Sequence, residues 1–247
     1  MHLSNRHNLA IYKVWAPLYD HAFERFFAPG RRRAFELLRL QPGERVLLLG
    51  VGTGSDLPLL PEGVKAVGID LSPHMLARAR AKLPLPGRDI ELLQGDAQEL
   101  LVDAGTFDAV VLNLILSVVP DGTACLRGAL QALKPGGRAV VFDKFRPAGR
   151  RASLARRILN LGSSFLGTDI TRSFEELARG LRHRVCHDEP SLLGGAYRIL
   201  LIEPGARAGD GRARALRWAG TSARLARRGG RSPKTPGRAA RCQCRGG

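Results

Sequence analysis

Three glycines on alternate positions, together with an acid that ends the next apolar run, are the residues of this chain best suited to hold a ligand. Gly50, Gly52 and Gly54 follow a wholly apolar run, Val46 to Leu49, and Asp70 closes the second run. An apolar run without alternation predicts a strand covered on both faces, and glycine lets the turn adopt positive φ. An acid at the tip of the next strand can accept hydrogen bonds from two ribose hydroxyls. The pattern predicts a site for a nucleoside-bearing ligand.

The glycine spacing distinguishes two kinds of nucleoside site. A dinucleotide fingerprint, GxGxxG, requires glycine where Ser55 stands, whereas this chain reads GxGxG followed by Ser55 and Asp56. This turn resembles motif I of the class I S-adenosylmethionine-dependent methyltransferases, with Asp70 in their ribose-binding position. The resemblance implies S-adenosyl-L-methionine as the cofactor, with Gly50, Val51, Gly52, Gly54, Asp70 and Leu71 among its binding residues.

Two later segments match the adenine end of the family's cofactor site. Ser72 is placed to cap a helix that Pro73 begins, and Met75 in its first turn lies near the adenine edge by family resemblance. Asp96 and Ala97 follow the third predicted strand, where the resemblance implies contacts with the adenine amino group and ring. We therefore expect Met75, Asp96 and Ala97 to bind the cofactor.

Asn113 ends the fourth predicted strand, residues 107–114. In a doubly wound sheet, ligands meet outside the carboxyl ends of the strands, so we expect Asn113 and residues 114–119 to line the junction of the cofactor and acceptor sites. The segment LSVVPD, residues 116–121, resembles the corresponding loop of phospholipid N-methyltransferases. Asn113 is thus a candidate both for cofactor binding and for positioning the acceptor.

The first forty residues form an amphipathic leader. Apolar residues at helical spacing predict two helices around Pro29 and Gly30 within residues 8–40. The pattern YxxWAPxYD at residues 12–20 resembles the leader of ubiquinone/menaquinone-type and bacterial phospholipid N-methyltransferases, which folds over the cofactor. Tyr19 and Asp20 are therefore candidate catalytic residues, for positioning rather than for acid–base chemistry.

The remaining elements complete a doubly wound α/β fold. We expect a helix after the glycine turn, a helix at 126–133, and a fifth strand at 138–142 within LKPGGRAVVFD, which is very similar to the methyltransferase pattern. A helix at 174–181 and strands at 184–189 and 196–202 follow, the last inserting antiparallel. The prediction is a mostly parallel seven-stranded sheet, with a helical leader at 1–40, a methyltransferase domain at 41–204 and a disordered tail at 205–247.

Positive charge is concentrated in two segments. The chain has 247 residues and a net charge of +17, and residues 205–247 hold +11 of it, with twelve Lys and Arg against one acid. Residues 143–172 show neither sheet nor core patterning and read as a basic, amphipathic lid. These segments favour a phosphate-bearing or membrane-resident acceptor and peripheral contact with an anionic membrane. An incidental basic tail and a solvated helix face are the alternatives.

Other sequence features limit the class of protein. The four cysteines form no disulfide framework, the N-terminus has no signal-peptide core, and no apolar stretch is long enough to cross a bilayer. We expect a cytoplasmic protein that can associate peripherally with a membrane. The sequence predicts neither a metal site nor a specific nucleic-acid partner, and it leaves the oligomeric state open.

The best functional hypothesis is methylation of a small-molecule or lipid acceptor, most like phosphatidylethanolamine N-methylation. A quinone-type C-methyltransferase is the second hypothesis, disfavoured because a carbon acceptor needs a base and none is convincing. The third is a cofactor-binding protein without catalysis. It is motivated by Leu48, which stands where the family's first strand commonly carries an acid that helps hold the amino group of the methionine moiety.

Overall fold

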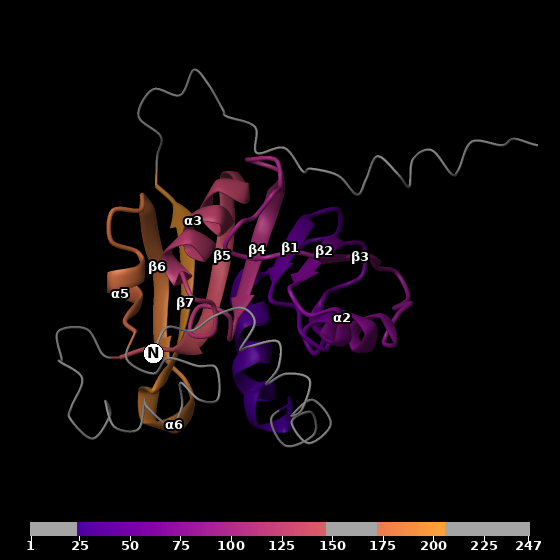
Figure 1. The fold of residues 1–247 in the computed structure, drawn as a ribbon, viewed down its shortest axis with the longest axis horizontal. Helices are drawn as coiled ribbons and strands as arrows, with labels where there is room; N and C mark the ends of the chain where they lie inside the picture. Colours follow the sequence, from indigo (N-terminus) through magenta and orange to yellow (C-terminus); the bar gives the residue numbers. More distant parts are fainter. Residues whose placement is uncertain (1–23, 147–171, 206–247) are drawn as a thin grey trace, which may run out of the picture.

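The computed structural model describes residues 24–146 and 172–205, which form one seven-stranded sheet with helices on both faces (Figure 1). The strand order is β3-β2-β1-β4-β5-β7-β6. Neighbouring strands are parallel except for β7, which is antiparallel to both β5 and β6. The strands are β1 (Arg45–Leu49), β2 (Lys65–Asp70), β3 (Asp89–Gln94), β4 (Phe107–Asn113), β5 (Leu133–Lys144), β6 (His183–Pro190) and β7 (Tyr197–Pro204). The predicted doubly wound sheet with an antiparallel last strand is confirmed.

Two apolar clusters, one on each face of the sheet, form the core. The helix at residues 24–38 and α2 (Pro73–Arg80) cover one face, where Phe35, Leu48 and Leu76 are buried together. The other face is covered by α3 (Gly122–Ala132) and α5 (Phe174–Leu177). A last short helix, α6 (Leu192–Gly195), joins β6 to β7. Because both faces are covered, the polar groups that can meet a ligand lie at the ends of the strands.

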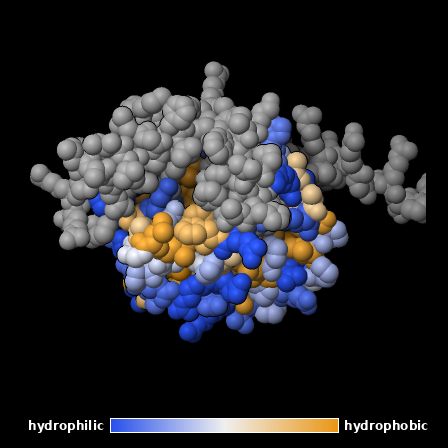
Figure 2. Space-filling model, turned by 90° about the horizontal axis from the view of Figure 1, so that it is seen from below, coloured by the Kyte–Doolittle hydropathy of each residue, from blue (hydrophilic) through white to orange (hydrophobic). Residues whose placement is uncertain are grey.

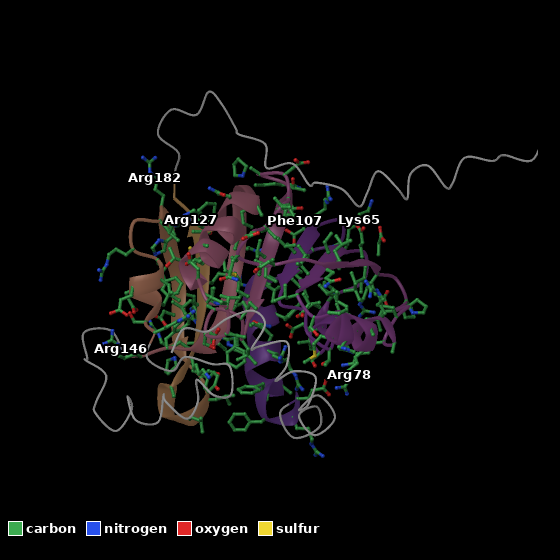
Figure 3. All side chains as sticks on the ribbon, viewed as in Figure 1. Lys65, Arg78, Phe107, Arg127, Arg146 and Arg182 are labelled. Atoms are coloured by element: carbon green, nitrogen blue, oxygen red, sulfur yellow. The ribbon has the colours of Figure 1, made fainter. Side chains whose placement is uncertain are left out.

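The carboxyl ends of the parallel strands lie at the lower edge in Figure 1. Figure 3 labels Lys65 and Phe107 at the opposite, upper edge, where β2 and β4 begin. Arg146, which follows β5, is labelled in the lower part of the same view. The lower edge is therefore the one at which a doubly wound sheet binds its ligands.

The predicted break at Pro29 and Gly30 is wrong, because residues 24–38 form one helix through both. A Cβ on Gly30 would lie 2.3 Å from Cζ of Phe142, so glycine lets the helix pack directly on β5. Glycine normally destabilises the interior of a helix, and the close packing on Phe142 explains why Gly30 stands there. Residues 8–23, where the other predicted helix falls, lie outside the described residues.

The helix predicted after the glycine turn is also wrong in extent. Only η1 (Leu57–Leu59) forms, a single 3₁₀ turn, and Leu60 is already extended with φ −65° and ψ 133°. Pro58 is the second residue of the turn and Pro61 follows Leu60, so the second proline excludes continuation as a regular helix. The chain passes directly from this turn toward β2.

Capping chemistry sets the starts of two other helices. Ser72 caps α2 by accepting a hydrogen bond from the N–H of Met75, with Pro73 as the first helical residue, as predicted. Asp121 caps α3 by accepting from the N–H of Ala124, so that this helix begins at Gly122, four residues before the predicted start. The predicted helix at 174–181 is shorter, ending at Leu177.

The expectation that residues 143–172 contain neither sheet nor core is wrong at its beginning. Asp143 and Lys144 are the last residues of β5, and the side chains of Asp143 and Phe145 are fully buried. The backbone N–H of Phe145 donates to the carbonyl of Ala196, which extends the pairing with the β7 side of the sheet. Residues 147–171, which carry most of the predicted lid, and residues 206–247 of the predicted tail lie outside the described residues.

Candidate active site

A cavity opens at the carboxyl ends of β1, β2, β3 and β4. Its wall combines the glycine turn, the end of β2, the start of α2, the residues after β3 and the segment after β4. The lining residues are Gly50, Gly52, Ile69, Asp70, Leu71, Ser72, Met75, Gly95, Asp96, Ala97, Leu114, Ile115, Val118 and Val119. Figure 2 views the molecule from this edge and shows apolar side chains in the middle of the face, bordered by hydrophilic ones.

Asp70 ties the glycine turn to the start of α2. Its Oδ2 accepts a hydrogen bond of 2.8 Å from the N–H of Gly52, and its Oδ1 accepts one of 2.9 Å from the N–H of Ser72. Burial raises the pKa of this carboxyl, while the two backbone N–H groups oppose the rise. Each oxygen accepts one backbone bond and keeps lone-pair capacity toward the cavity, as a ribose-binding acid requires.

The glycines of the turn are required by close packing as well as by backbone conformation. Gly50 has φ +68°, and a Cβ there would lie 2.6 Å from Cδ1 of Ile115 on the opposite wall. Gly54 has φ +79°, and its Cβ would lie 3.1 Å from Cα of Ala79, in α2. A side chain at Gly50 would displace Ile115 of the cavity wall, and one at Gly54 would push the turn away from α2.

Asp96 is linked by side chains to the segment that precedes α3. Its Oδ1 accepts from the backbone N–H of Gln98 at 2.9 Å, and the Gln98 amide also donates to the same carboxylate. Oε1 of Gln98 in turn accepts a 2.6 Å hydrogen bond from the N–H of Asp121. The predicted adenine end of the cavity is thereby connected to the cap of α3.

The wall after β4 is held to β5 at two points, Leu114 and Ser117. Leu114 adopts φ +59°, unusual for a leucine, and donates its N–H to the carbonyl of Phe142 at 2.7 Å. Asp143 is fully buried and accepts from the N–H of Ser117 at 3.0 Å and from the N–H of Lys144 at 2.8 Å. Burial raises the pKa of Asp143, opposed by these bonds and one from the Ser117 hydroxyl. This carboxylate, missed by the sequence prediction, fixes the segment to β5.

Asn113 lies beside the cavity and not on its lining. Its Nδ2 donates a 3.1 Å hydrogen bond to Oδ2 of Asp56, whose Oδ1 accepts a 2.8 Å bond from Nη1 of Arg31. Asp56 and Asn113 are both almost fully buried. Oδ1 of Asn113 is buried and has no hydrogen-bond partner within the part of the chain that the structure describes. Arg31, Asp56 and Asn113 together are called the polar trio below.

Apart from Asn113, the predicted site residues fall into three groups. Most of the predicted cofactor residues line the cavity: Gly50, Gly52, Asp70, Leu71, Met75, Asp96 and Ala97. Val51 is buried in the apolar cluster and Gly54 packs on α2, so both support the turn from behind. Tyr19 and Asp20 lie outside the described residues. Ile115, Val118 and Val119 belong to the segment expected at the junction and do line the cavity.

Two kinds of feature are absent from residues 24–146 and 172–205. These residues contain no cluster of His, Cys, Asp or Glu that could hold a metal ion. None of their helices has the length and apolar character needed to span a membrane. Cys125 is a buried free thiol whose pKa is raised by burial, and Cys186 is an exposed free thiol.

Comparisons with known proteins identify the family. Residues 47–141 match the model of a methyltransferase domain family. Over 195 residues the chain is 35% identical to phosphatidylethanolamine N-methyltransferase of Cereibacter sphaeroides, an alignment that covers 78% of this chain and 95% of that protein. This chain belongs to the class I S-adenosylmethionine-dependent methyltransferases. The methyltransferase therefore uses S-adenosyl-L-methionine as its methyl donor.

Other relatives of this methyltransferase match over shorter stretches. Demethylmenaquinone methyltransferase of Beutenbergia cavernae is 39% identical over 114 residues, 46% of this chain and 46% of that protein. The chain thus spans about half the length of that relative. A solved S-adenosylmethionine-dependent methyltransferase from Thermotoga maritima aligns over 80% of this chain and 99% of its own with a TM-score of 0.57 at 24% identity. At that identity, the structural likeness supports the fold of the methyltransferase.

Proposed function

We propose that this methyltransferase methylates the amine of a phosphatidylethanolamine-type phospholipid. The observation that carries the proposal is the 35% identity to the Cereibacter sphaeroides phosphatidylethanolamine N-methyltransferase across 95% of that protein. Alignment over nearly the whole relative includes the segments that surround the cavity, where acceptor choice is determined in this fold. The acceptor assignment is therefore drawn from more than the shared cofactor domain.

In this proposal, different cavity residues bind different parts of the cofactor. Asp70 accepts the ribose hydroxyls, because it lies on the cavity wall and both oxygens are already oriented by backbone N–H groups. Asp96 and Ala97 bind the adenine end beside Met75. Gly50 and Gly52 allow the backbone to approach the methionine end. The unpaired, buried Oδ1 of Asn113, next to Leu114 of the lining, supports a further polar contact with the cofactor in this proposal.

The chemistry requires alignment more than acid–base groups. S-adenosyl-L-methionine supplies an activated methyl group on a sulfonium, which an acceptor displaces in line. The protein contributes by orienting the two reactants and excluding water. Ile115, Val118 and Val119 provide an apolar wall for this purpose. Among the described residues, the lining carries two carboxylates, Asp70 and Asp96, and both are assigned to the cofactor; in this proposal the amine therefore arrives neutral or loses its proton to water.

Two exposed apolar side chains support a lipid acceptor in this proposal. Phe26 is 43% exposed near the start of the described part of the helix at 24–38, and Leu193 in α6 is 67% exposed. Leu193 holds φ +53°, a conformation that leucine rarely adopts, in a turn at the carboxyl end of β6. Together with the excess of positive charge in the chain, these residues support a cytoplasmic enzyme that contacts an anionic membrane peripherally.

Quinone C-methylation is the second candidate, favoured by the 39% identity to demethylmenaquinone methyltransferase over 114 residues of the chain. It is weaker for a chemical reason. A carbon nucleophile forms by loss of a proton to a base, and among the described residues the cavity lining offers no carboxylate or histidine beyond the two acids assigned to the cofactor.

Incubation of the purified full chain with methyl-labelled S-adenosylmethionine and a bacterial lipid extract tests the proposal. We expect label in N-methylated derivatives of phosphatidylethanolamine. Label confined to the quinone fraction would replace the proposal with the second candidate. Cofactor binding without label in any fraction would support the third hypothesis, a cofactor-binding protein without catalysis.

A further inference from the structure

The amide of Asn113 has a fixed orientation. Its partner Asp56 presents a carboxylate oxygen, which only accepts, so the Asn113 nitrogen must face Asp56 at 3.1 Å. Oδ1 therefore faces the other way. It is buried and lacks a hydrogen-bond partner among the described residues. Because a buried acceptor without a partner costs free energy, this atom indicates a missing donor.

Asp56 is itself held in place. Nη1 of Arg31 donates to its Oδ1 at 2.8 Å, while Asn113 donates to its Oδ2. Asp56 is 3% exposed, so the ion pair is largely shielded from water. The polar trio thus joins the helix at 24–38, the turn after β1 and the end of β4. Arg31 and Asp56 balance each other in charge, so a cation that approaches Asn113 meets no uncompensated positive charge.

The position of the polar trio relative to Leu48 indicates which part of a ligand the trio would contact. Leu48 in β1 pairs with Val111 in β4, and its fully buried side chain belongs to an apolar cluster that also contains Val111. Asn113 follows Val111 by two residues, so it points to the same face of the sheet, one step closer to the carboxyl edge. Continuing the register places Asn113 level with Gly50, which lines the cavity. The polar trio therefore provides polar groups just beyond Leu48, the position at which the first strand of related methyltransferases commonly carries an acid.

We propose that Oδ1 of Asn113 accepts a hydrogen bond from the ammonium group of the cofactor's methionine moiety, and that Asp56 and Arg31 are positioning residues that orient this amide. The trio replaces the carboxylate that Leu48 lacks. An ammonium group has three donors and no acceptor, which matches a lone carbonyl oxygen. This inference rests on the cofactor assignment of the cavity and is independent of the acceptor.

Calorimetric titration of the full chain with three ligands tests the inference. The ligands are S-adenosylhomocysteine, its desamino analogue and 5′-methylthioadenosine, which lacks the amino-acid part. We expect the wild type to bind S-adenosylhomocysteine about tenfold or more tighter than the desamino analogue, the size of a hydrogen bond to a charged group. In Asn113→Leu this preference should fall below about threefold, with methylthioadenosine binding unchanged.

Two further variants separate orientation from folding. Asp56→Asn preserves shape but lets the Asn113 amide face either way, so the preference for the ammonium ligand should fall to an intermediate value. Asn113→Ala removes the amide and leaves a smaller side chain. If Asn113→Leu no longer binds methylthioadenosine, Asn113→Ala replaces it, and its preference for S-adenosylhomocysteine over the desamino analogue should likewise fall below about threefold.

An undiminished preference in the Asn113 variants overturns the inference. So does a preference that stays intact while the KM of the acceptor amine rises, because Oδ1 then serves the acceptor. A wild type that binds neither S-adenosylhomocysteine nor methylthioadenosine contradicts the cofactor assignment of the cavity itself, which is a different failure.

Discussion

Arg172 donates a hydrogen bond of 2.7 Å to the carbonyl of Val119, a residue of the cavity wall. The same guanidinium donates to the carbonyls of Leu116 at 2.7 Å and Pro120 at 2.9 Å. The carbonyl of Arg172 also accepts from the N–H of Arg146 at 2.8 Å, so the residues on either side of segment 147–171 are paired. Arg146 and Arg172 therefore lie next to each other, and Arg172 also binds the cavity wall.

Replacing Arg172 by Met keeps the length of the side chain and removes its donors. We expect faster hydrogen exchange at residues 116–120 and a KM for S-adenosylmethionine raised about 3- to 10-fold, because the wall loses several charge-assisted bonds. Arg127→Met, on the exposed side of α3 and labelled in Figure 3, is the matched control. Unchanged exchange and KM in the Arg172 variant would show that the wall does not depend on these bonds.

Gly30→Ala should destabilise the protein by about 1–3 kcal/mol in urea unfolding, because the added methyl overlaps the ring of Phe142. The double variant Gly30→Ala with Phe142→Leu should lose less stability than the two single changes added together, since the smaller side chain leaves room for the methyl. Simple additivity would contradict the direct contact.

Protonation of Glu189 makes the free energy of unfolding depend on pH in the acid range. Hydrogen bonds from Arg33, at 2.8 and 3.1 Å, lower the pKa of this carboxyl to about 2, with a smaller contribution from His187. A folded-state pKa below the ordinary value of 4.5 adds stability above that value, which disappears as pH falls toward 2. Urea unfolding of wild type and Glu189→Gln should therefore show a smaller loss between pH 6 and pH 3 in the variant, by a modest amount since the pair is partly exposed.

Glu62→Gln, at an exposed acid, is the control for the pH series and should follow the wild type. Parallel acid curves for wild type and Glu189→Gln would exclude the Arg33 pair as a source of the pH dependence.

The sequence predicted well those helices and strands whose positions depend on residues close together in the chain. The Ser72 cap followed by Pro73 predicted the start of α2, and apolar runs predicted most of the strands, although not the polar strand β6. The Pro29 and Gly30 prediction was wrong because the helix is maintained by Phe142, which lies far along the chain. The prolines at positions 58 and 61 were visible signals against a helix after the turn, so that error was avoidable.

In the candidate site, too, residues placed by the local backbone could be predicted and residues brought together by tertiary packing could not. Glycine spacing and strand-end acids predicted most of the cavity lining, because these residues act where the backbone places them. The partners of Asn113 could not be predicted, since Asp56 and Arg31 reach it only through tertiary packing of the helix at 24–38. Asp143 was assigned to a lid because its neighbours are basic, although its carboxylate is buried and holds Ser117.

The central claim is that the cavity at Asp70 binds S-adenosylmethionine, and calorimetric titration of the purified full chain with S-adenosylmethionine tests it most directly. The wild type should bind, and Asp70→Ala should weaken binding by about 1–3 kcal/mol through loss of hydrogen bonds to the carboxylate. Asp89→Ala, at an exposed acid beginning β3, should leave the affinity unchanged. No binding to the wild type at millimolar cofactor, or equal affinity for wild type and Asp70→Ala, would contradict the claim.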